Sequence, residues 1–198
     1  MKKLITTIAM TVTLGFAAAA QAATLLDILL SDDDMFDDNQ NDFDIVTQAI
    51  ATCSADLRAG ADNPEATLTA FLPTDKAFRI LVDDVFGVSV KNEAELFGAI
   101  AGAFDCETID IILKYHVAPA TLYAADVLTL ESGDMVPNLA MLPLEVSFKG
   151  RKGKGQIRLV DNEPMLRNPI VVATDIMADN GVAHVIDRVL LPIAVITE

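Results

Sequence analysis

Apolar residues recur through the first half of the chain at the three- and four-residue steps of a helix face. One such face, made of Phe43, Val46, Ile50, Cys53 and Leu57, predicts a single helix that ends near Gly60. The helices predicted in this way cover 24–30, 43–60, 75–82, 96–104, 109–115 and 124–130. The N-terminal part of the chain is therefore expected to be mainly helical.

Strand patterns are shorter and lie mostly in the second half. Apolar residues alternate over 68–72, and Pro73 should end that strand, with Thr74 as the N-cap of the next helix. Runs rich in β-branched residues, separated by Gly, Pro, Asn and Asp, predict strands at 144–148, 157–160, 170–177 and 182–189. Helices segregated from hairpin-linked strands predict an α+β domain with antiparallel sheets, not a βαβ nucleotide-binding fold.

Charge and composition exclude several classes of protein. The chain has 198 residues, with 14 Lys and Arg against 29 Asp and Glu, a formal net charge of −15. A nucleic-acid-binding protein needs clustered basic residues, so this charge argues against one. Two His and two Cys cannot build a zinc cluster of the usual kind. We therefore expect no cofactor and no resident metal of that type.

The first 22 residues have the pattern of a secretory signal. A short positive start, Met1-Lys2-Lys3, precedes an uncharged, mostly apolar run that ends in Ala20-Gln21-Ala22. An N-terminal membrane anchor is the alternative, but the small residues favour cleavage after Ala22. We expect one secreted or periplasmic domain over 23–198, without membrane insertion once the signal has been removed.

The two cysteines fit an oxidising compartment. Cys53 and Cys106 are the only pair in the chain, and a disulfide between them would close a loop of just over fifty residues. The alternative is two buried free thiols that pack as small apolar groups. We favour the disulfide.

An acidic insertion at about 31–44 carries seven Asp and no basic residue. Such a run is usually a solvated loop, and a calcium-binding loop is the alternative because calcium prefers carboxylate oxygens. In a helix–loop–helix site the first three ligands would be Asp37, Asn39 and Asn41. The Gly of the turn is replaced by Asp42, however, and the closing Glu by Gln48.

Catalytic motifs are sparse. The chain has no Gly-x-Ser-x-Gly elbow, and its two imidazoles are His116 and His184. We interpret His116 as a hydrogen-bonded structural histidine at a helix exit, and His184 as half-buried packing in a strand. The alternative functions are a hydrolase that uses His116 with a nearby carboxylate, and a calcium-binding or small-ligand-binding protein that uses the Asp-rich loop.

Three segments together resemble the fasciclin-domain family (fasciclin I-like, beta-Ig-H3/fasciclin). They are LTAFLPTDKAF at 68–78, ILKYHVAP at 112–119 and NGVAHVIDRVLLP at 180–192. The first and third resemble the two family signatures, and the second resembles its Tyr-His segment. The signature positions carried over are Thr69, Phe71, Pro73, Thr74, Ala77, Phe78, Asn180, Gly181, His184, Val185, Ile186, Asp187, Leu190 and Pro192.

The resemblance implies a fasciclin-like fold, an antiparallel β-sandwich wedge with a helical lobe. It also implies a non-catalytic adhesion or protein-interaction module that binds proteins or extracellular matrix polymers. The implied partner-binding residues are Tyr115 and His116, and also Asp175-Ile176-Met177, which match the end of an integrin-binding motif of an animal relative. Ala173-Thr174 replace the Glu-Pro that precedes this triplet there. Most signature residues have structural roles as core, cap or turn residues, with Phe71, Phe78, Val185, Ile186 and Leu190 expected in the core.

Overall fold

The computed structural model describes residues 23–31, 35–37, 39–150 and 155–195. The predicted signal sequence (1–22) and four Asp of the acidic insertion (32–34 and 38) lie outside those ranges. The helices are α1 (Leu25–Leu29), α2 (Asp44–Cys53), α3 (Ala55–Asp62), α4 (Asp75–Phe86), α5 (Glu93–Ala103), α6 (Cys106–Tyr115) and α7 (Ala124–Val127). The strands are β1 (Leu68–Pro73), β2 (Val117–Ala118), β3 (Glu145–Lys149), β4 (Gln156–Val160), β5 (Val171–Ala178) and β6 (Gly181–Ile186). Among the helices described, none has the length and apolar character needed to cross a membrane.

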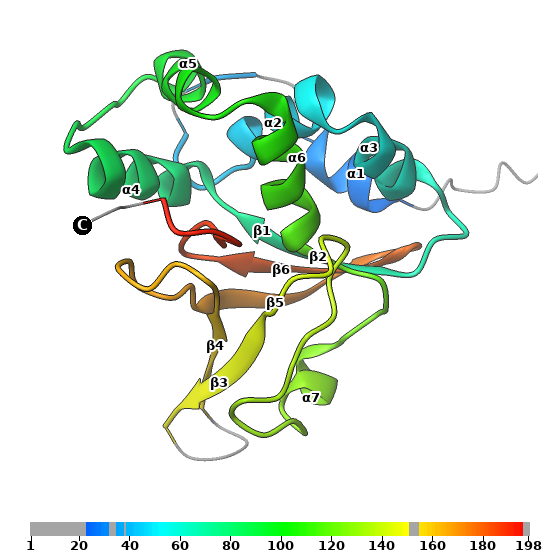
Figure 1. Ribbon diagram of the computed structural model, residues 1–198. Helices are drawn as coiled ribbons and strands as arrows, with labels where there is room; N and C mark the ends of the chain where they lie inside the picture. Colours follow the sequence, from blue (N-terminus) through cyan, green and yellow to red (C-terminus); the bar gives the residue numbers. More distant parts are fainter. Residues whose placement is uncertain (1–22, 32–34, 38, 151–154, 196–198) are drawn as a thin grey trace, which may run out of the picture.

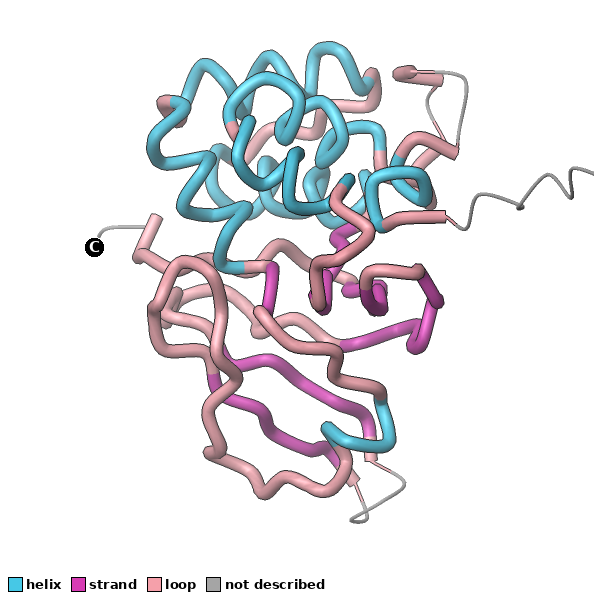
Figure 2. Tube along the Cα trace, turned by 90° about the vertical axis from the view of Figure 1, so that its right-hand side faces the viewer, coloured by secondary structure: helices cyan, strands magenta, loops and turns pink. Residues whose placement is uncertain are grey.

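Helices and strands occupy separate layers, as the sequence predicts. Helices α1 to α6 cover one side of a four-stranded sheet, and the β3–β4 hairpin and α7 lie on the other side (Figure 1). Figure 2 shows the same separation from the side, with the helical layer at one end of the molecule. The α+β class is therefore confirmed.

The four-stranded sheet has the order β2-β1-β6-β5, and it is not wholly antiparallel as predicted. Strand β1 pairs in parallel with β6, in a register that sets Leu68 opposite Gly181. The pairs β1–β2 and β5–β6 are antiparallel. The prediction of antiparallel sheets came from strands linked by hairpins, and a hairpin fixes the relative direction only of strands that are consecutive in the sequence. The chain between β1 and β6 includes most of the helical layer, so β6 can enter beside β1 in either direction.

Strand β1 is buried on both faces, because each face meets a different apolar core. Leu68, Ala70 and Leu72 belong to the core under the helices, whereas Phe71 belongs to the core on the β3–β4 side. Four of the five predicted core residues are buried, and Val185 is half-buried. The buried four are Phe71, Phe78, Ile186 and Leu190. The alternation read from the sequence thus distributes side chains between two cores.

The helix predicted over 43–60 is in fact two helices, α2 and α3, which meet at Ser54. Ser54 has φ −138° and ψ 73°, which lie outside the helical region. Its hydroxyl donates to the carboxylate of Asp110 on α6. The apolar spacing runs through Ser54 without interruption, so periodicity alone does not reveal the break.

The predicted disulfide between Cys53 and Cys106 is present. It joins the last residue of α2 to the first residue of α6, with the two Cα atoms 4.9 Å apart. The bond therefore fixes two helices of the layer that covers the sheet.

Candidate functional site

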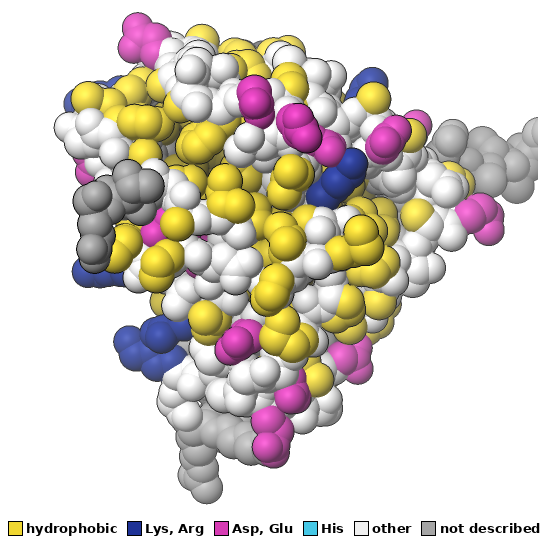
Figure 3. Space-filling view, in the orientation of Figure 1, with side chains coloured by type: hydrophobic (Ala, Val, Ile, Leu, Met, Phe, Trp, Pro, Cys, Tyr) yellow, Lys and Arg dark blue, Asp and Glu magenta, His cyan; other side chains and the backbone are white. Residues whose placement is uncertain are grey.

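Strand β5 lies at the edge of the sheet, and most of its side chains are exposed. Val172 is 58% exposed and Met177 is 62% exposed. Tyr123, just before α7, and Ile111 on α6 are also exposed apolar residues. Figure 3 shows hydrophobic side chains across the middle of the face on which α6, β5 and α7 lie in Figure 1. Clustered exposed apolar side chains are typical of a surface that contacts another protein.

The middle of β5 departs from regular strand geometry at Asp175. Asp175 has φ 59°, and the pairing with β6 shifts register on either side of Ala173. The Asp175 carboxylate Oδ1 accepts the N–H of Ala124 at 2.8 Å, and Ile176 packs against the helical core. Of the predicted triplet Asp175-Ile176-Met177, Met177 therefore offers the side chain that is most open to a partner.

His184 supports this irregular stretch of β5 from the neighbouring strand. Its Nε2 lies 2.8 Å from the carbonyl oxygen of Leu122, and its Nδ1 accepts the N–H of Asp175 at 3.2 Å. These contacts place the imidazole proton on Nε2. The ring is 2% exposed and packs 5.8 Å from the Phe71 ring, centroid to centroid. The expected half-buried packing is thus full burial.

Tyr115 and His116, the other predicted contact residues, lie inside the fold. The Tyr115 hydroxyl donates to the carbonyl of Pro143. In His116, Nδ1 lies 2.7 Å from the Ile112 carbonyl oxygen, and Nε2 accepts the Leu190 N–H at 2.9 Å. Burial lowers the pKa of His116 to about 4, so the ring is neutral at physiological pH. Burial therefore leaves neither side chain accessible to a partner at the surface.

Asn180 ties the turn between β5 and β6 to the helical layer. Its Oδ1 accepts the N–H of Leu25 at 2.9 Å, and its Nδ2 donates to the carbonyls of Ala61 and Asn63 at 2.8 and 3.0 Å. The side chain is buried, so water cannot replace these partners. This signature residue therefore acts in the fold.

Two further signature residues also hold loops to strands. The Thr69 hydroxyl donates to the Ala120 carbonyl at 2.6 Å and accepts the N–H of Leu122 at 2.8 Å. Asp187 Oδ1 accepts the N–H of Ile170 at 2.7 Å. Both contacts position the chain that flanks β5.

A second notable group is a buried acidic cluster at the start of α4. Carboxylate oxygens of Asp42, Asp75 and Glu93 lie within 4.8 Å of one another, and all three residues are buried. Glu93 pairs with the Arg79 guanidinium at 2.8 Å. Thr74 occupies the N-cap position of α4 as predicted, but its side chain makes no capping bond.

Burial raises the pKa of Asp75 to about 8, and the nearby charges of Asp42 and Glu93 act in the same direction. Asp75 Oδ1 accepts the N–H of Ile45 at 3.0 Å, a bond that favours the charged form but is outweighed by burial. Burial also raises the pKa of Asp42. At neutral pH the folded protein therefore holds a proton on Asp75 that the unfolded chain releases.

Because the folded protein holds this proton, we expect the free energy of unfolding to fall as pH rises from 7 to 8. A chelator is present in the measurement, so that no bound cation contributes. The folded state then binds more protons than the unfolded state, so the free energy of unfolding should drop by about 1 kcal/mol over that range. His116, with a pKa of about 4, and Asp161, raised by burial to about 6, have lost their protons in the folded state by pH 7. Urea unfolding at several pH values measures the slope.

The matched variants are Asp75→Asn, which mimics the protonated acid, and Asp83→Asn, which alters an exposed carboxylate on the same helix. The slope should vanish in Asp75→Asn and persist in Asp83→Asn. An unchanged slope in Asp75→Asn would assign the proton to another group.

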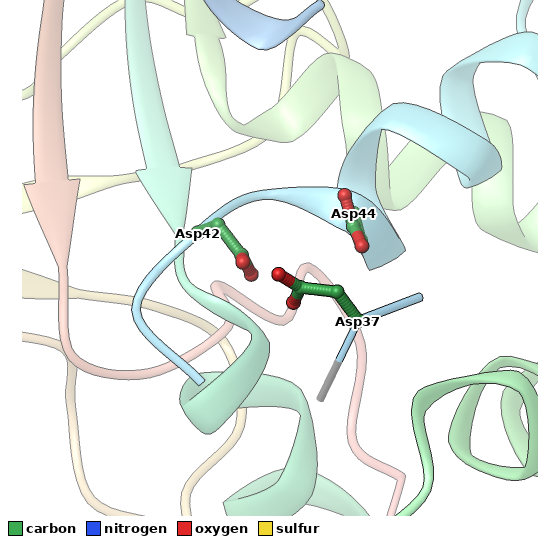
Figure 4. A group of neighbouring side chains, drawn as sticks. All are labelled: Asp37, Asp42 and Asp44. Carbon is green, nitrogen blue, oxygen red and sulfur yellow. The ribbon is translucent and has the colours of Figure 1, made fainter. Parts of the chain in front are cut away.

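A second acidic group overlaps the first at Asp42. Asp37, Asp42 and Asp44 also place carboxylate oxygens within 4.8 Å of one another. Figure 4 shows the carboxylates of Asp37 and Asp42 facing each other, with that of Asp44 reaching toward them from the start of α2. Asn39 and Asn41 are instead held in the loop, where the N–H of Asn39 donates to Asp37 Oδ1 at 2.7 Å. These three carboxylates are the group that could hold a hard cation.

Sequence reasoning missed the burial of Asp75 and Glu93 and the exposure of Val172. Asp75 reads as a first-turn acid of α4, and Glu93 as one of many surface acids. Their burial follows from the packing of α4 against α5, which no local pattern reports. The exposure of Val172 could have been found from the sequence. Val172 directly follows Val171, so it breaks the alternation of apolar and polar residues in its strand.

The other predicted functions find little geometric support among the described residues. Both ring nitrogens of His116 contact main-chain groups, so neither is open to a substrate. The apolar cavity beside His116, lined by residues such as Ile45, Phe78 and Leu113, has a volume of about 30 Å³. That space suits no ligand much larger than a water molecule.

Comparison with known proteins agrees with this fold. The family model described as "Fasciclin domain" matches residues 41–192. The insect cell adhesion molecule fasciclin I contains a pair of FAS1 domains whose structure superposes with a TM-score of 0.60. That match has 22% sequence identity and covers 85% of this chain and 51% of the fasciclin I chain. At this identity the likeness shows the fold alone.

Two proteins of Synechocystis sp. (strain ATCC 27184 / PCC 6803 / Kazusa) are similar in sequence. Protein sll1483 is 32% identical over 146 residues, which are 74% of this chain and 66% of the relative. Protein sll1735 is 28% identical over 146 residues, which are 73% of this chain and 87% of the relative. The chain thus spans just under two thirds of the first relative and about half of the fasciclin I pair. With the family model matched over most of its length, the chain belongs to the fasciclin-domain family.

Proposed function

We propose that this protein is an exported adhesion or protein-interaction module that contacts another protein or a matrix polymer through the β5 face. Fasciclin domains are known for cell adhesion and protein interaction, are generally non-enzymatic, and are typically extracellular or secreted. The single observation that carries the choice of surface is the exposure of Val172 and Met177 on an edge strand. We define the β5 face as Val172, Asp175 and Met177.

The geometry of β5 favours side-chain contact over the addition of a partner strand. The left-handed residue Asp175 and the register shifts around Ala173 interrupt the row of main-chain groups that a partner strand would need. A partner would instead bury Val172 and Met177, and about 25 cal/mol would be gained for each Å² of apolar surface removed from water. The matching partner surface is therefore apolar with a polar rim.

A cell-attachment assay tests this proposal. Beads coated with residues 23–198 are expected to bind cells of the producing organism, and Val172→Asp/Met177→Asp should lower the number of attached beads at least ~10-fold. Both positions are exposed, so the variant should keep its melting temperature.

Met35→Asp is the matched control, because Met35 is 65% exposed and lies in the acidic insertion, outside the β5 face. Attachment should be unchanged in this variant. Equal attachment by the β5 variant and the wild type would reject this face as the contact surface, and loss in both variants would assign the effect to added charge.

A further inference from the structure

Four basic side chains line one hollow beside the loop that leads from β4 to β5. The hollow has a volume of about 420 Å³, and its cations are Lys149, Arg158, Arg167 and Arg188. These four residues define the basic hollow. Figure 3 shows Lys and Arg side chains gathered at the left edge, beside the β3–β4 hairpin of Figure 1. On a chain with a formal net charge of −15, this clustering concentrates positive charge in one place.

Most of the positive charge in the basic hollow has no acidic partner. Arg188 pairs with Asp84 of α4 at 2.9 Å. The other three cations form no ion pair within the part of the chain that the structure describes. Among the described residues that line the hollow, Asp187 is the only acid. The positive charge of the lining therefore exceeds its negative charge and is available to an anion.

Strand pairing fixes the positions from which two of these cations extend. Arg158 lies opposite Ser147 in the β3–β4 hairpin, two residues from Lys149, so the two cations share one face of the hairpin. Val146 and Leu159 belong to the opposite face, which is buried in the core. The hairpin therefore presents its cations on the side away from that core.

The β4–β5 loop and the end of β6 supply the other side of the basic hollow. Ile170 forms an isolated β-bridge with Arg158, and its N–H donates to Asp187 Oδ1 at 2.7 Å. Arg167 comes three residues before Ile170, and Arg188 directly follows Asp187. The main chain thus holds the four cations on connected segments, which lowers the cost of ordering them around a ligand.

The remaining lining suits hydroxyl groups and the rings of sugars. Asp187 Oδ2 has no hydrogen-bond partner among the described residues, and the Asn168 side chain can donate through Nδ2. Leu166 and Ile170 add aliphatic surface. The Asp187 carboxylate repels a ligand that carries only acceptor oxygens, such as a phosphate chain, but it accepts a hydrogen bond from a hydroxyl. This lining favours a saccharide that also carries anionic groups.

The charge of the rest of the chain restricts the shape of the partner. Outside the basic hollow, acidic residues outnumber basic ones by more than the formal net charge of −15 indicates. An anionic bilayer or a nucleic-acid duplex would extend beyond the hollow and be repelled by those residues. A single narrow chain avoids this repulsion. A polymer of uronic acids fits, because each of its rings carries one carboxylate together with hydroxyl groups.

From this arrangement we propose that the basic hollow binds a carboxylated polysaccharide. The carboxylates of successive uronic acid rings pair with Lys149, Arg158 and Arg167, and Asp187 accepts a ring hydroxyl. Guanidinium groups suit this role, because they bind a carboxylate through two parallel N–H···O bonds. The lining shares no residue with the β5 face, so the hollow is a second binding surface beyond the one proposed above.

Calorimetric titration of the folded protein with oligogalacturonate in calcium-free buffer tests the proposal. We expect saturable binding at low salt that weakens as sodium chloride is added, because the contacts are ionic. Fully methyl-esterified oligogalacturonate, which has no free carboxylate, should not bind. Polyglutamate supplies carboxylates without sugar hydroxyls, so at equal carboxylate concentration it should bind at least ~10-fold more weakly.

Arg167→Gln should weaken oligogalacturonate binding at least ~10-fold, because it removes a charge-assisted contact. Arg167 is exposed, so the melting temperature should not change. Arg167→Lys keeps the charge but loses the planar fork, and should recover only part of the affinity. The matched control is Arg58→Gln, which removes an exposed cation from α3, outside the hollow, and should bind as the wild type does.

Three results would overturn the proposal. The first is the absence of saturable binding at low salt. The second is wild-type affinity in Arg167→Gln, or an equal loss in Arg58→Gln, which would mean attraction to positive charge anywhere on the surface. The third is equal or tighter binding of polyglutamate or single-stranded DNA, which would assign the hollow to another class of polyanion.

Discussion

Replacement of Gly181 by Ala is expected to lower the free energy of unfolding by at least about 4 kcal/mol, a size that single substitutions seldom reach. Gly181 has φ 151° and pairs with Leu68 across the parallel β1–β6 junction. A Cβ at this position would lie 1.9 Å from the carbonyl oxygen of Leu68 and 2.8 Å from its carbonyl carbon. The colliding atoms belong to the main chain of a strand that is buried on both faces, so they cannot move aside cheaply.

Gly98→Ala is the matched control for this prediction. Gly98 is exposed within helix α5, and a Cβ there would meet nothing within 4 Å. Alanine in a helix interior is more favourable than glycine by about 0.5–1 kcal/mol, so this variant should be more stable than the wild type. Urea unfolding of both variants gives the two values. A Gly181→Ala variant within 1 kcal/mol of the wild type would show that β1 and β6 can separate at this point.

The surroundings of Gly181 could be predicted only in part from the sequence. The signature Asn180-Gly181 predicts a tight turn, and the turn between β5 and β6 lies there. The signature does not predict that Gly181 must admit a strand from the opposite half of the chain, because that contact joins residues more than a hundred positions apart. Local patterns report the conformation of a segment, whereas its neighbours in space depend on the whole fold.

For the candidate sites, too, local patterns predicted the segments but not their neighbours in space. Asp175, Ile176 and Met177 could be placed on a strand from composition, but the exposure of Met177 depends on β5 being an edge strand. The acidic insertion could be recognised as a possible set of calcium ligands. The spacing of a helix–loop–helix site, however, would select Asp37, Asn39 and Asn41. In the structure Asp37 lies beside Asp42 and Asp44 instead. This grouping follows from the main-chain hydrogen bonds that hold Gln40 and Asp42 to the start of α4.

Removal of the disulfide is expected to lower the free energy of unfolding by about 4 kcal/mol. Cys53 and Cys106 are 53 positions apart, and the chain-entropy argument assigns this value to a loop of that length. Cys106 is exposed and Cys53 is half-buried against the helical core, so serine at these positions leaves no fully buried polar group. The effect of Cys53→Ser/Cys106→Ser should therefore come mainly from the greater freedom of the unfolded chain.

Urea unfolding of the oxidised wild type, the reduced wild type and the double variant measures this effect. The reduced wild type and the double variant should agree, and reductant should leave the double variant unchanged. Because the disulfide restricts the unfolded chain, removing it should also raise the denaturant dependence of the free energy, as more surface becomes exposed on unfolding. A loss of less than 1 kcal/mol in the double variant would contradict the prediction, because it would show that residual structure keeps the two segments close together in the unfolded chain even without the bond.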